Sequence, residues 1–259
     1  MARWSKRRFF PRRFAPLQGE AMPGGAVASG LSLSEQVTAL GPLVQYDISR
    51  LDTLFADRSA TPSTPASVDG VVGTVLDISG NGCHAIAPND ASRAILRQSG
   101  SLYYLEFDGV NDGYNFSNDL IGLTNTSFTA AGVTTLDSSP SLLLSAGGVG
   151  GVGTPLVLIA QDGSSAGCNS PSVTETRVNG VSIGTQTRAA LYAAITTGNP
   201  SIMSALGLTT DIISPALSGY STSFRWDMDL FGVAVLNSSD AQDRLLVDQW
   251  LASLAGVSL

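Results

Sequence analysis

Two short segments hold most of the side chains that could do chemistry in this chain. Residues 77–85 read Asp-Ile-Ser-Gly-Asn-Gly-Cys-His-Ala, and residues 104–116 read Tyr-Leu-Glu-Phe-Asp-Gly-Val-Asn-Asp-Gly-Tyr-Asn-Phe. Their carboxylate and amide oxygens are hard donors of the kind that calcium prefers. No spacing matches a full calcium-loop pattern, so we expect no cofactor and keep calcium as the alternative. The candidate calcium ligands are Asp77, Asn81, Asp108 and Asp112.

Turn formation is the simpler role for the same two segments. Each contains two glycines, which can adopt the positive φ that a tight reversal requires: Gly80, Gly82, Gly109 and Gly113. The Asp and Asn side chains can accept hydrogen bonds from the backbone of their own turn. The sequence therefore favours structural turns. The residues assigned to these turn motifs are Asp77, Gly80, Asn81, Gly82, His84, Asp108, Gly109 and Asp112.

Groups that could carry catalysis are sparse. His84 is the only histidine, so a serine or cysteine triad must use it, and it directly follows Cys83. Adjacent side chains in a turn point apart, which favours a histidine bonded to a backbone carbonyl over a catalytic pair. Glu106 and Asp108 lie two apart and can share one face of a strand, but no further glutamate follows to complete a hydrolase pattern. We therefore expect a protein that is not an enzyme, with a glycan hydrolase as the less favoured alternative.

The cysteines and the apolar runs exclude some classes of protein. Cys83 and Cys168 are the only cysteines, and their separation fits neither a zinc cluster nor a redox motif. They are either free or bridged across the fold. No stretch approaches the roughly 18 uninterrupted apolar residues of a membrane helix, and the N-terminal segment lacks the apolar core of an export signal, so no membrane partner is expected.

Charge is divided sharply along the chain. Six of the 14 basic residues lie within the first 13 positions, which leaves 8 basic against 21 acidic residues and a formal charge of −13 for the remainder. An anionic body repels the phosphate backbone, which argues against nucleic acid as a partner of the body. Only the N-terminal segment carries the charge that such a partner needs.

Residues 1–42 form a separate unit by composition, a basic and Pro-rich arm followed by a short helix. Aromatic residues alternate with arginines there, a mixture that can anchor in protein grooves while guanidinium groups pair with carboxylates. We expect docking on a protein assembly, with nucleic acid and a solvated tail as alternatives. The expected anchoring residues are Arg3, Trp4, Arg7, Arg8, Phe9, Phe10, Arg12, Arg13 and Phe14.

Residues 43–259 are predicted to form one all-β domain. Short apolar runs alternate with turn clusters at 102–107, 128–136, 141–146, 155–160, 173–178, 202–208 and 229–236. Asn179-Gly180 indicates a tight hairpin, and the glycine tract at 147–153 indicates a hairpin loop.

Two helices are expected beside the strands. Ser32 and Glu35 form a capping box before residues 33–40, and Ser239 with Gln242 is the second such pair, before a helix over 240–254 that Gly256 ends.

The two turn segments resemble the concanavalin A-like, laminin-G-like jelly-roll family, whose modules occur in many bacteriophage virion proteins. In that family an Asp-x-Ser-Gly-Asn-Gly-x-His-Ala turn precedes a Phe-Asp-Gly-Val-Asp-Asp strand end, as residues 77–85 and 107–112 do here. Similar segments lie at 47–55, at Val-Asn-Gly 178–180 and in the C-terminal strand and helix, so the resemblance covers residues 47–259. It implies an all-β, concanavalin A-like jelly-roll sandwich with a short N-terminal helix, an extended N-terminal arm and a C-terminal helix.

The resemblance also implies a role. We expect a virion structural protein, a tail-fibre or tail-tip module or a head decoration, that is attached to other virion proteins by its arm and forms a homo-oligomer. A host surface glycan is the second partner that the family suggests, although aromatic residues in strands are more often core than sugar platforms. A free carbohydrate-binding lectin is the alternative. The candidate platforms are Tyr103, Tyr104, Tyr114, Tyr220 and Trp226.

Overall fold

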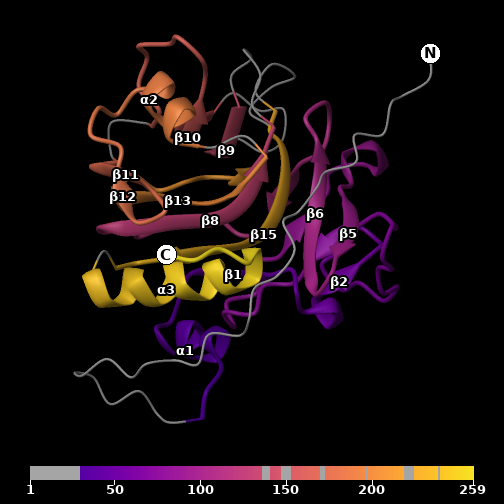
Figure 1. Cartoon of the computed structure of the whole chain (residues 1–259). Coiled ribbons are helices and arrows are strands. Elements are labelled where there is room, and N and C mark those ends of the chain that lie inside the picture. Colours follow the sequence, from indigo (N-terminus) through magenta and orange to yellow (C-terminus); the bar gives the residue numbers. More distant parts are fainter. Residues whose placement is uncertain are drawn as a thin grey trace, which may run out of the picture.

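The computed structural model describes residues 30–135, 141–146, 153–169, 173–195, 198–218, 225–238 and 240–259. Within these residues the chain is an all-β sandwich of two antiparallel sheets with a few helices (Figure 1). The all-β sandwich expected from the sequence is therefore confirmed.

The first sheet is built around two long strands, β8 (Thr126–Thr134) and β15 (Asp227–Leu236), whose residues are buried almost throughout. The first half of β15 pairs with β6 and its second half pairs with β1 (Val44–Asp47). The order of the other strands is β12-β11-β13 beside β8 and β6-β5 beside β15. Their bounds are β5 Ile95–Ser99, β6 Leu102–Asp108, β11 Glu175–Val178, β12 Val181–Ser182 and β13 Pro200–Leu208.

The second sheet consists mainly of short strands in the order β10-β9-β14-β7-β4-β3-β2. The 77–85 turn lies between β3 and β4, and the 108–112 turn lies where the chain leaves β6 in the first sheet for β7 in the second. The bounds are β2 Leu54–Phe55, β3 Thr74–Val75, β4 Ala85–Ile86, β7 Tyr114–Phe116, β9 Ser141–Ala146, β10 Gly153–Ala160 and β14 Ala216–Leu217.

A helical layer covers the outer face of the first sheet. Figure 1 shows α3 (Ala241–Ala255) lying across β15 and β8, with α1 (Leu33–Ala39) beside it. This layer has an apolar cluster of its own, in which Phe231 and Trp250 are each 1% exposed. A Cβ atom on Gly232 would lie 2.9 Å from a methyl carbon of Leu254, so a glycine in β15 lets the helix approach the sheet closely. Further short helices are η1 Leu51–Thr53, η2 Asp90–Ser92 and α2 Arg188–Ala194.

The elements expected from local patterns are largely present. The seven apolar runs correspond to β6, β8, β9, β10, β11, β13 and β15. The predicted capping box of Ser32 and Glu35 caps the N-terminus of α1. Asn179 and Gly180 have φ of +50° and +75° in the β11–β12 hairpin. Strands β9 and β10 pair as a hairpin, while residues 147–152 of the glycine tract lie outside the described residues.

One predicted cap is wrong. The N-cap of α3 is Asp240, whose side chain accepts hydrogen bonds from the backbone nitrogens of Gln242 and Asp243, and Ser239 lies outside the described residues. An aspartate is an equally good N-cap, and the following backbone sets which of the two adjacent residues is used. The predicted end at Gly256 is confirmed, with φ of +67°.

Candidate functional site

The Asp77 carboxylate organises the first turn motif. One of its oxygens accepts hydrogen bonds from the backbone nitrogens of Gln45 at 2.9 Å and Ser79 at 3.0 Å. The other accepts from the Ser79 hydroxyl at 2.6 Å and from the Cys83 nitrogen at 3.1 Å. Because Gln45 belongs to β1, this buried side chain ties the β3–β4 hairpin to the opposite sheet.

His84 and Asn81 complete the same turn. The Nδ1 atom of His84 accepts a hydrogen bond from the Asp77 backbone nitrogen at 3.1 Å, so the expected carbonyl partner is wrong and the ring acts as an acceptor. The Asn81 side chain donates to the Pro42 carbonyl at 2.8 Å. Both side chains hold backbone groups in place. Cys83 is buried and free, as is Cys168, so the disulfide alternative is wrong.

Asp108 and Asp112 bind each other's backbone in the second motif. One Asp108 oxygen accepts from the nitrogens of Val110 at 2.8 Å and Asn111 at 3.0 Å, and Asp112 accepts from the Asp108 nitrogen at 2.8 Å. Asp112 is only 6% exposed, and burial raises the pKa of its carboxyl to about 7, with repulsion from Asp108 adding to the effect. Backbone hydrogen bonding from Asp108 and the nearby charge of Arg225 act in the opposite direction.

The four glycines of the motifs serve two different purposes. Gly80, Gly82 and Gly109 have φ of +92°, +67° and +69°, as the sequence predicts. The same prediction for Gly113 is wrong. Gly113 is needed for space, because a Cβ atom there would collide with the backbone oxygen of Ser218.

The calcium candidates do not come together. Both oxygens of Asp77 and one oxygen of Asp108 accept hydrogen bonds from backbone or hydroxyl donors. In the part of the chain that the structure describes, no group of three or more His, Cys, Asp or Glu side chains is arranged to hold a metal ion.

The residues considered for a hydrolase are engaged in separate contacts. Glu106 accepts from the Arg97 guanidinium at 2.8 Å and lies opposite Asp229 in the β6–β15 ladder, while Asp108 is turned into its own loop. Glu106 and Asp108, which the sequence allows on one strand face, are therefore held by different partners.

Most of the described candidate sugar platforms belong to the core. Tyr114 and Trp226 are fully buried, and the Tyr114 hydroxyl donates to the Val72 carbonyl at 2.6 Å. Tyr103 and Tyr104 are partly buried and pack against the two apolar clusters. Tyr220 and all nine expected anchoring residues of the arm, Arg3 to Phe14, lie outside the described residues, so anchoring stays a prediction.

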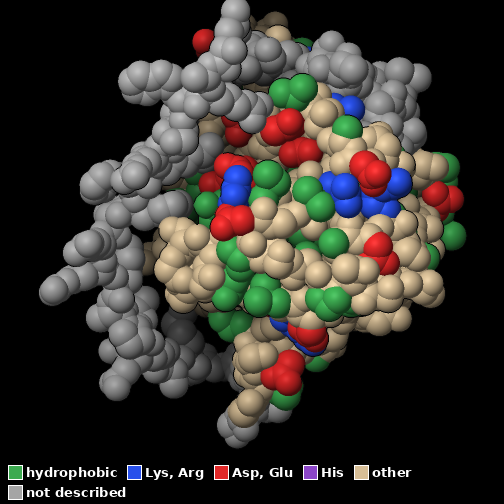
Figure 2. All heavy atoms as spheres, turned by 90° about the vertical axis from the view of Figure 1, so that its right-hand side faces the viewer, with side chains coloured by type: hydrophobic (Ala, Val, Ile, Leu, Met, Phe, Trp, Pro, Cys, Tyr) green, Lys and Arg blue, Asp and Glu red, His purple; other side chains and the backbone are tan. Residues whose placement is uncertain are grey.

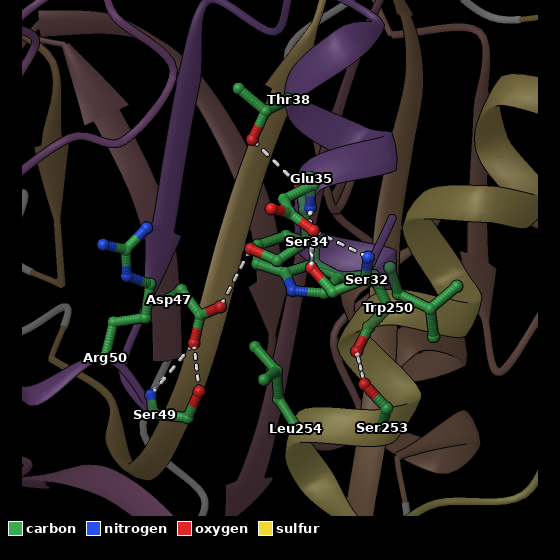
Figure 3. A pocket seen from close by; sticks show the side chains of 11 residues that line it. Ser32, Ser34, Glu35, Thr38, Asp47, Ser49, Arg50, Trp250, Ser253 and Leu254 are labelled. Carbon is green, nitrogen blue, oxygen red and sulfur yellow. Dashed lines mark hydrogen bonds between the residues drawn. The ribbon is translucent and has the colours of Figure 1, made fainter. Parts of the chain in front are cut away.

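The structure contains a polar pocket that sequence patterns did not indicate. It has a volume of about 510 Å³ and lies between α1, the end of β1 and α3 (Figure 3). Its residues come from sequence positions about 200 apart, so no local spacing marks it. The lining residues are Ser32, Leu33, Ser34, Glu35, Thr38, Asp47, Ser49, Arg50, Trp250, Ser253 and Leu254.

Two carboxylates with different surroundings line this pocket. Glu35 is exposed, and hydrogen bonds from the Ser32 nitrogen at 2.7 Å and hydroxyl at 2.8 Å lower the pKa of its carboxyl, which keeps it ionised. Asp47 is buried and accepts from the Ser49 hydroxyl at 2.5 Å and from the Ser34 hydroxyl at 3.1 Å. The pocket therefore offers acceptors at fixed positions.

Arg50 and Trp250 also line the pocket. Arg50 pairs with Asp52 through Nη2 at 2.8 Å, and this hydrogen bond raises the pKa of the guanidinium. The Trp250 indole nitrogen is buried and has no hydrogen-bond partner among the described residues. In Figure 3 this nitrogen lies on the edge of the ring that faces Asp47 and Leu254.

Comparison with known proteins leaves the family open. No protein-family model matches the chain, and no curated protein matches it. Among solved structures it is similar to the Trypanosoma rangeli sialidase in complex with the inhibitor DANA, at 12% sequence identity and a TM-score of 0.41, over 77% of this chain and 36% of that chain. The chain thus spans about a third of that protein.

This match corrects one expectation. The matched protein is a sialidase, an enzyme, which contradicts the expectation that this chain is not an enzyme, and we do not retain that expectation. The likeness is compatible with an all-β sandwich, and at this level it transfers neither an activity nor a site. Among the described helices, none is both long and apolar enough to cross a membrane.

Proposed function

We propose that this protein is a structural component of a bacteriophage virion, a concanavalin A-like jelly-roll module displayed on the particle and attached through its N-terminal arm. The observation that carries the proposal is the division of charge, with six basic residues in the first 13 positions and a formal charge of −13 on the remainder. A cationic arm on an anionic body favours docking on an acidic partner surface. The two turn motifs, which resemble those of phage modules, support the virion assignment.

The root of the arm is firmly joined to the sandwich. Val37 of α1 is fully buried in the helical layer, and the Gln45 side chain of β1 donates to the Ser34 carbonyl at 3.1 Å. The Thr38 hydroxyl donates to the Gln45 side-chain oxygen at 2.8 Å. A force on the arm therefore passes through α1 into β1 and the central sheet, which suits a tether.

Most arginines of the body are paired with carboxylates in the part of the chain that the structure describes. Among the described residues, five of the eight arginines after position 13 pair with carboxylates, and Figure 2 shows such blue and red groups in contact on one face. Pairing leaves the acidic excess on the surface, so the body does not compete with the arm for an acidic partner. The paired arginines are Arg50, Arg58, Arg93, Arg97 and Arg177.

Deletion of residues 2–29 tests the attachment. We expect the truncated protein to keep its circular dichroism spectrum and melting temperature and to be missing from purified particles. A variant with Arg7, Arg8, Arg12 and Arg13 changed to Gln should lose incorporation, and the matched variant with Lys at the same positions should keep most of it.

Incorporation of the truncated protein at the wild-type level would contradict the proposal. A truncated protein that binds a glycan array as the full chain does, with neither form found in particles, would favour the free lectin. The homo-oligomer stays a prediction, which light scattering on the full chain tests.

A further inference from the structure

We infer that a surface patch on the body binds the basic N-terminal arm of the same chain. The isoleucine patch consists of Asp119, Ile121, Asp211 and Ile213, and the segment that it receives is residues 8–14. Docking there holds the arm on its own body until a partner surface replaces it. The inference does not depend on virion attachment, because both partners belong to this chain.

Two loop segments form the patch by pairing outside the named strands. Leu120 and Ile212 exchange backbone hydrogen bonds of 2.9 and 2.8 Å as an isolated antiparallel bridge, and both side chains are buried. Successive side chains of an extended segment point to opposite sides, so the next residues, Ile121 and Ile213, point outward. Their exposed fractions are 64% and 54%. At diagonal positions of one bridge, the two side chains form a joint apolar surface.

A carboxylate accompanies each exposed isoleucine. Asp119 and Asp211 stand two positions before the isoleucines, so both segments have an Asp-x-Ile pattern. Asp119 Oδ1 accepts a hydrogen bond from the Ser214 nitrogen at 2.7 Å. Asp211 Oδ1 accepts one from the Leu123 nitrogen at 3.1 Å. Among the described residues neither carboxylate has a basic partner within ion-pair distance. The patch therefore presents two fixed negative charges around an apolar centre.

Residues 8–14 of the arm carry the complementary groups. They read Arg-Phe-Phe-Pro-Arg-Arg-Phe, with arginines on both sides of an apolar Phe-Phe-Pro centre. Guanidinium groups form strong charge-assisted hydrogen bonds with carboxylates, and phenylalanine rings bury a large apolar area. The segment thus matches the patch in both charge and apolar surface.

The charges of the patch select against other occupants. Nucleic acid and an anionic membrane surface are repelled by both carboxylates. A second copy of the patch would place like charges opposite each other across the interface. A basic segment with aromatic residues has neither problem, and within this chain only the arm concentrates six basic residues in 13 positions.

The arm of the same chain is long enough to reach the patch. The Asn118 side chain donates to the Asn81 carbonyl at 3.3 Å, and the Asn81 side chain donates to the Pro42 carbonyl at 2.8 Å. Pro42 follows α1, a helix about 10 Å long, at whose other end the arm begins. Residues 15–29 can span about 50 Å when extended. A tethered segment acts at an effective concentration of about millimolar, which favours the chain's own arm over that of a second copy.

The test places a nitroxide label on the arm of the full-length chain. Ser5→Cys supplies the labelling site, because Cys83 and Cys168 are buried and burial raises the pKa of both thiols. The isoleucine methyl groups are labelled with ¹³C and assigned with isoleucine-to-valine variants. We expect the nitroxide to lower the intensities of the Ile121 and Ile213 signals at least twofold relative to the same sample after reduction of the label.

Ile95 of β5 is the internal control. It is in register with Val133 of β8 through β6 and β15. The patch segment is held at the other end of β8, where the Asn237 side chain accepts from the Thr126 hydroxyl and donates to the Gly122 carbonyl. About 23 Å of strand separates these two ends. The Ile95 signal should therefore keep its intensity.

A mixed sample distinguishes the chain's own arm from that of a second copy. It contains equal amounts of nitroxide-labelled chain without ¹³C and ¹³C-labelled chain without nitroxide. We expect no loss of intensity at Ile121 or Ile213 in this sample. A loss there would assign the patch to the arm of a second copy and overturn the inference. Unchanged intensities of both signals in the doubly labelled chain would overturn it as well.

Two double variants test the role of the charges. Asp119→Asn with Asp211→Asn keeps both Oδ1 acceptors and removes two negative charges, so the effect of the nitroxide on the two isoleucine signals should fall at least twofold. Asp69→Asn with Asp90→Asn is the control, because it removes the same charge from exposed positions near β5. Circular dichroism checks that both variants are folded. A patch variant that responds no more than the control variant would contradict the assignment.

Discussion

The two Asp-Gly turn motifs resemble each other in sequence but place their buried carboxylates in different surroundings. Asp77 is 9% exposed and accepts four hydrogen bonds, from Gln45, Ser79 and Cys83. Asp112 is 6% exposed and accepts one among the described residues, from Asp108. The two carboxylates are buried to a similar degree, so their surroundings differ mainly in the number of hydrogen-bond donors.

The difference has an energetic consequence. Four donors compensate the desolvation of Asp77, and its carboxylate joins a hairpin of one sheet to β1 of the other. Asp112 has little compensation, and burial raises its pKa to about 7. Asp77 therefore stabilises the sandwich through its hydrogen bonds, whereas burial of Asp112 favours its neutral acid below about pH 7. The following predictions test this contrast, from the largest expected effect to the smallest.

Replacement of Asp77 by Asn should destabilise the protein most. The amide nitrogen would face the Cys83 N–H and the Ser79 hydroxyl, so a buried donor loses its acceptor, and we expect a loss of about 3 kcal/mol in the free energy of unfolding. Urea denaturation measures it. Ser79→Ala removes one donor and should cost only about 1 kcal/mol. Equal losses would show that Asp77 is not the centre of the network.

Replacement of Asp112 by Asn should change how stability depends on pH. The Asp112 carboxyl holds its proton up to about pH 7 in the folded protein, whereas in the unfolded chain it releases the proton near 3.8, the ordinary pKa of an aspartate. Wild-type stability should therefore fall as pH rises through this window, relative to the Asn variant, by at most about 1.4 kcal/mol per pH unit. Urea denaturation of both proteins at pH 4.5 and pH 7.5 gives their free energies of unfolding. If the wild type and the Asn variant differ in this free energy by the same amount at both pH values, the raised pKa is disproved.

Two alanine substitutions separate the roles of the glycines. Gly113→Ala should cost about 2 kcal/mol, because the new methyl group meets the Ser218 backbone. Gly82→Ala should cost about 1 kcal/mol, because its Cβ meets open space and only the positive φ of +67° opposes it. Thermal melts of both variants check the order, and a larger loss for Gly82 would reverse our interpretation.

Calcium should have the smallest effect. Both oxygens of Asp77 and one oxygen each of Asp108 and Asp112 accept hydrogen bonds from protein donors. Among the described residues no group of three or more His, Cys, Asp or Glu side chains could hold a metal ion, so addition of about 5 mM CaCl₂ should move the melting temperature by less than about 1 °C. A rise of several degrees that Asp108→Asn abolishes would restore the calcium site.

The sequence by itself determined the features that depend on neighbouring residues, namely helix caps, tight turns and backbone conformations. The Ser32–Glu35 capping box, the Asn179-Gly180 hairpin and the positive φ at Gly82 each depend on residues within a few positions of one another. Hydrogen bonds at that range and the conformational freedom of glycine act before any tertiary contact forms. The charge of the N-terminal arm belongs to the same class, since it is a property of composition.

Only the tertiary structure decided what depends on distant segments. Gly113 is required by Ser218, and the donors to Asp77 include Gln45 of another strand. The pocket joins residues near position 40 to Trp250, and the lack of a partner for its indole N–H is visible only after packing is complete. Burial and unsatisfied hydrogen-bonding groups are properties of the packed chain, because they depend on what every other segment covers or leaves open.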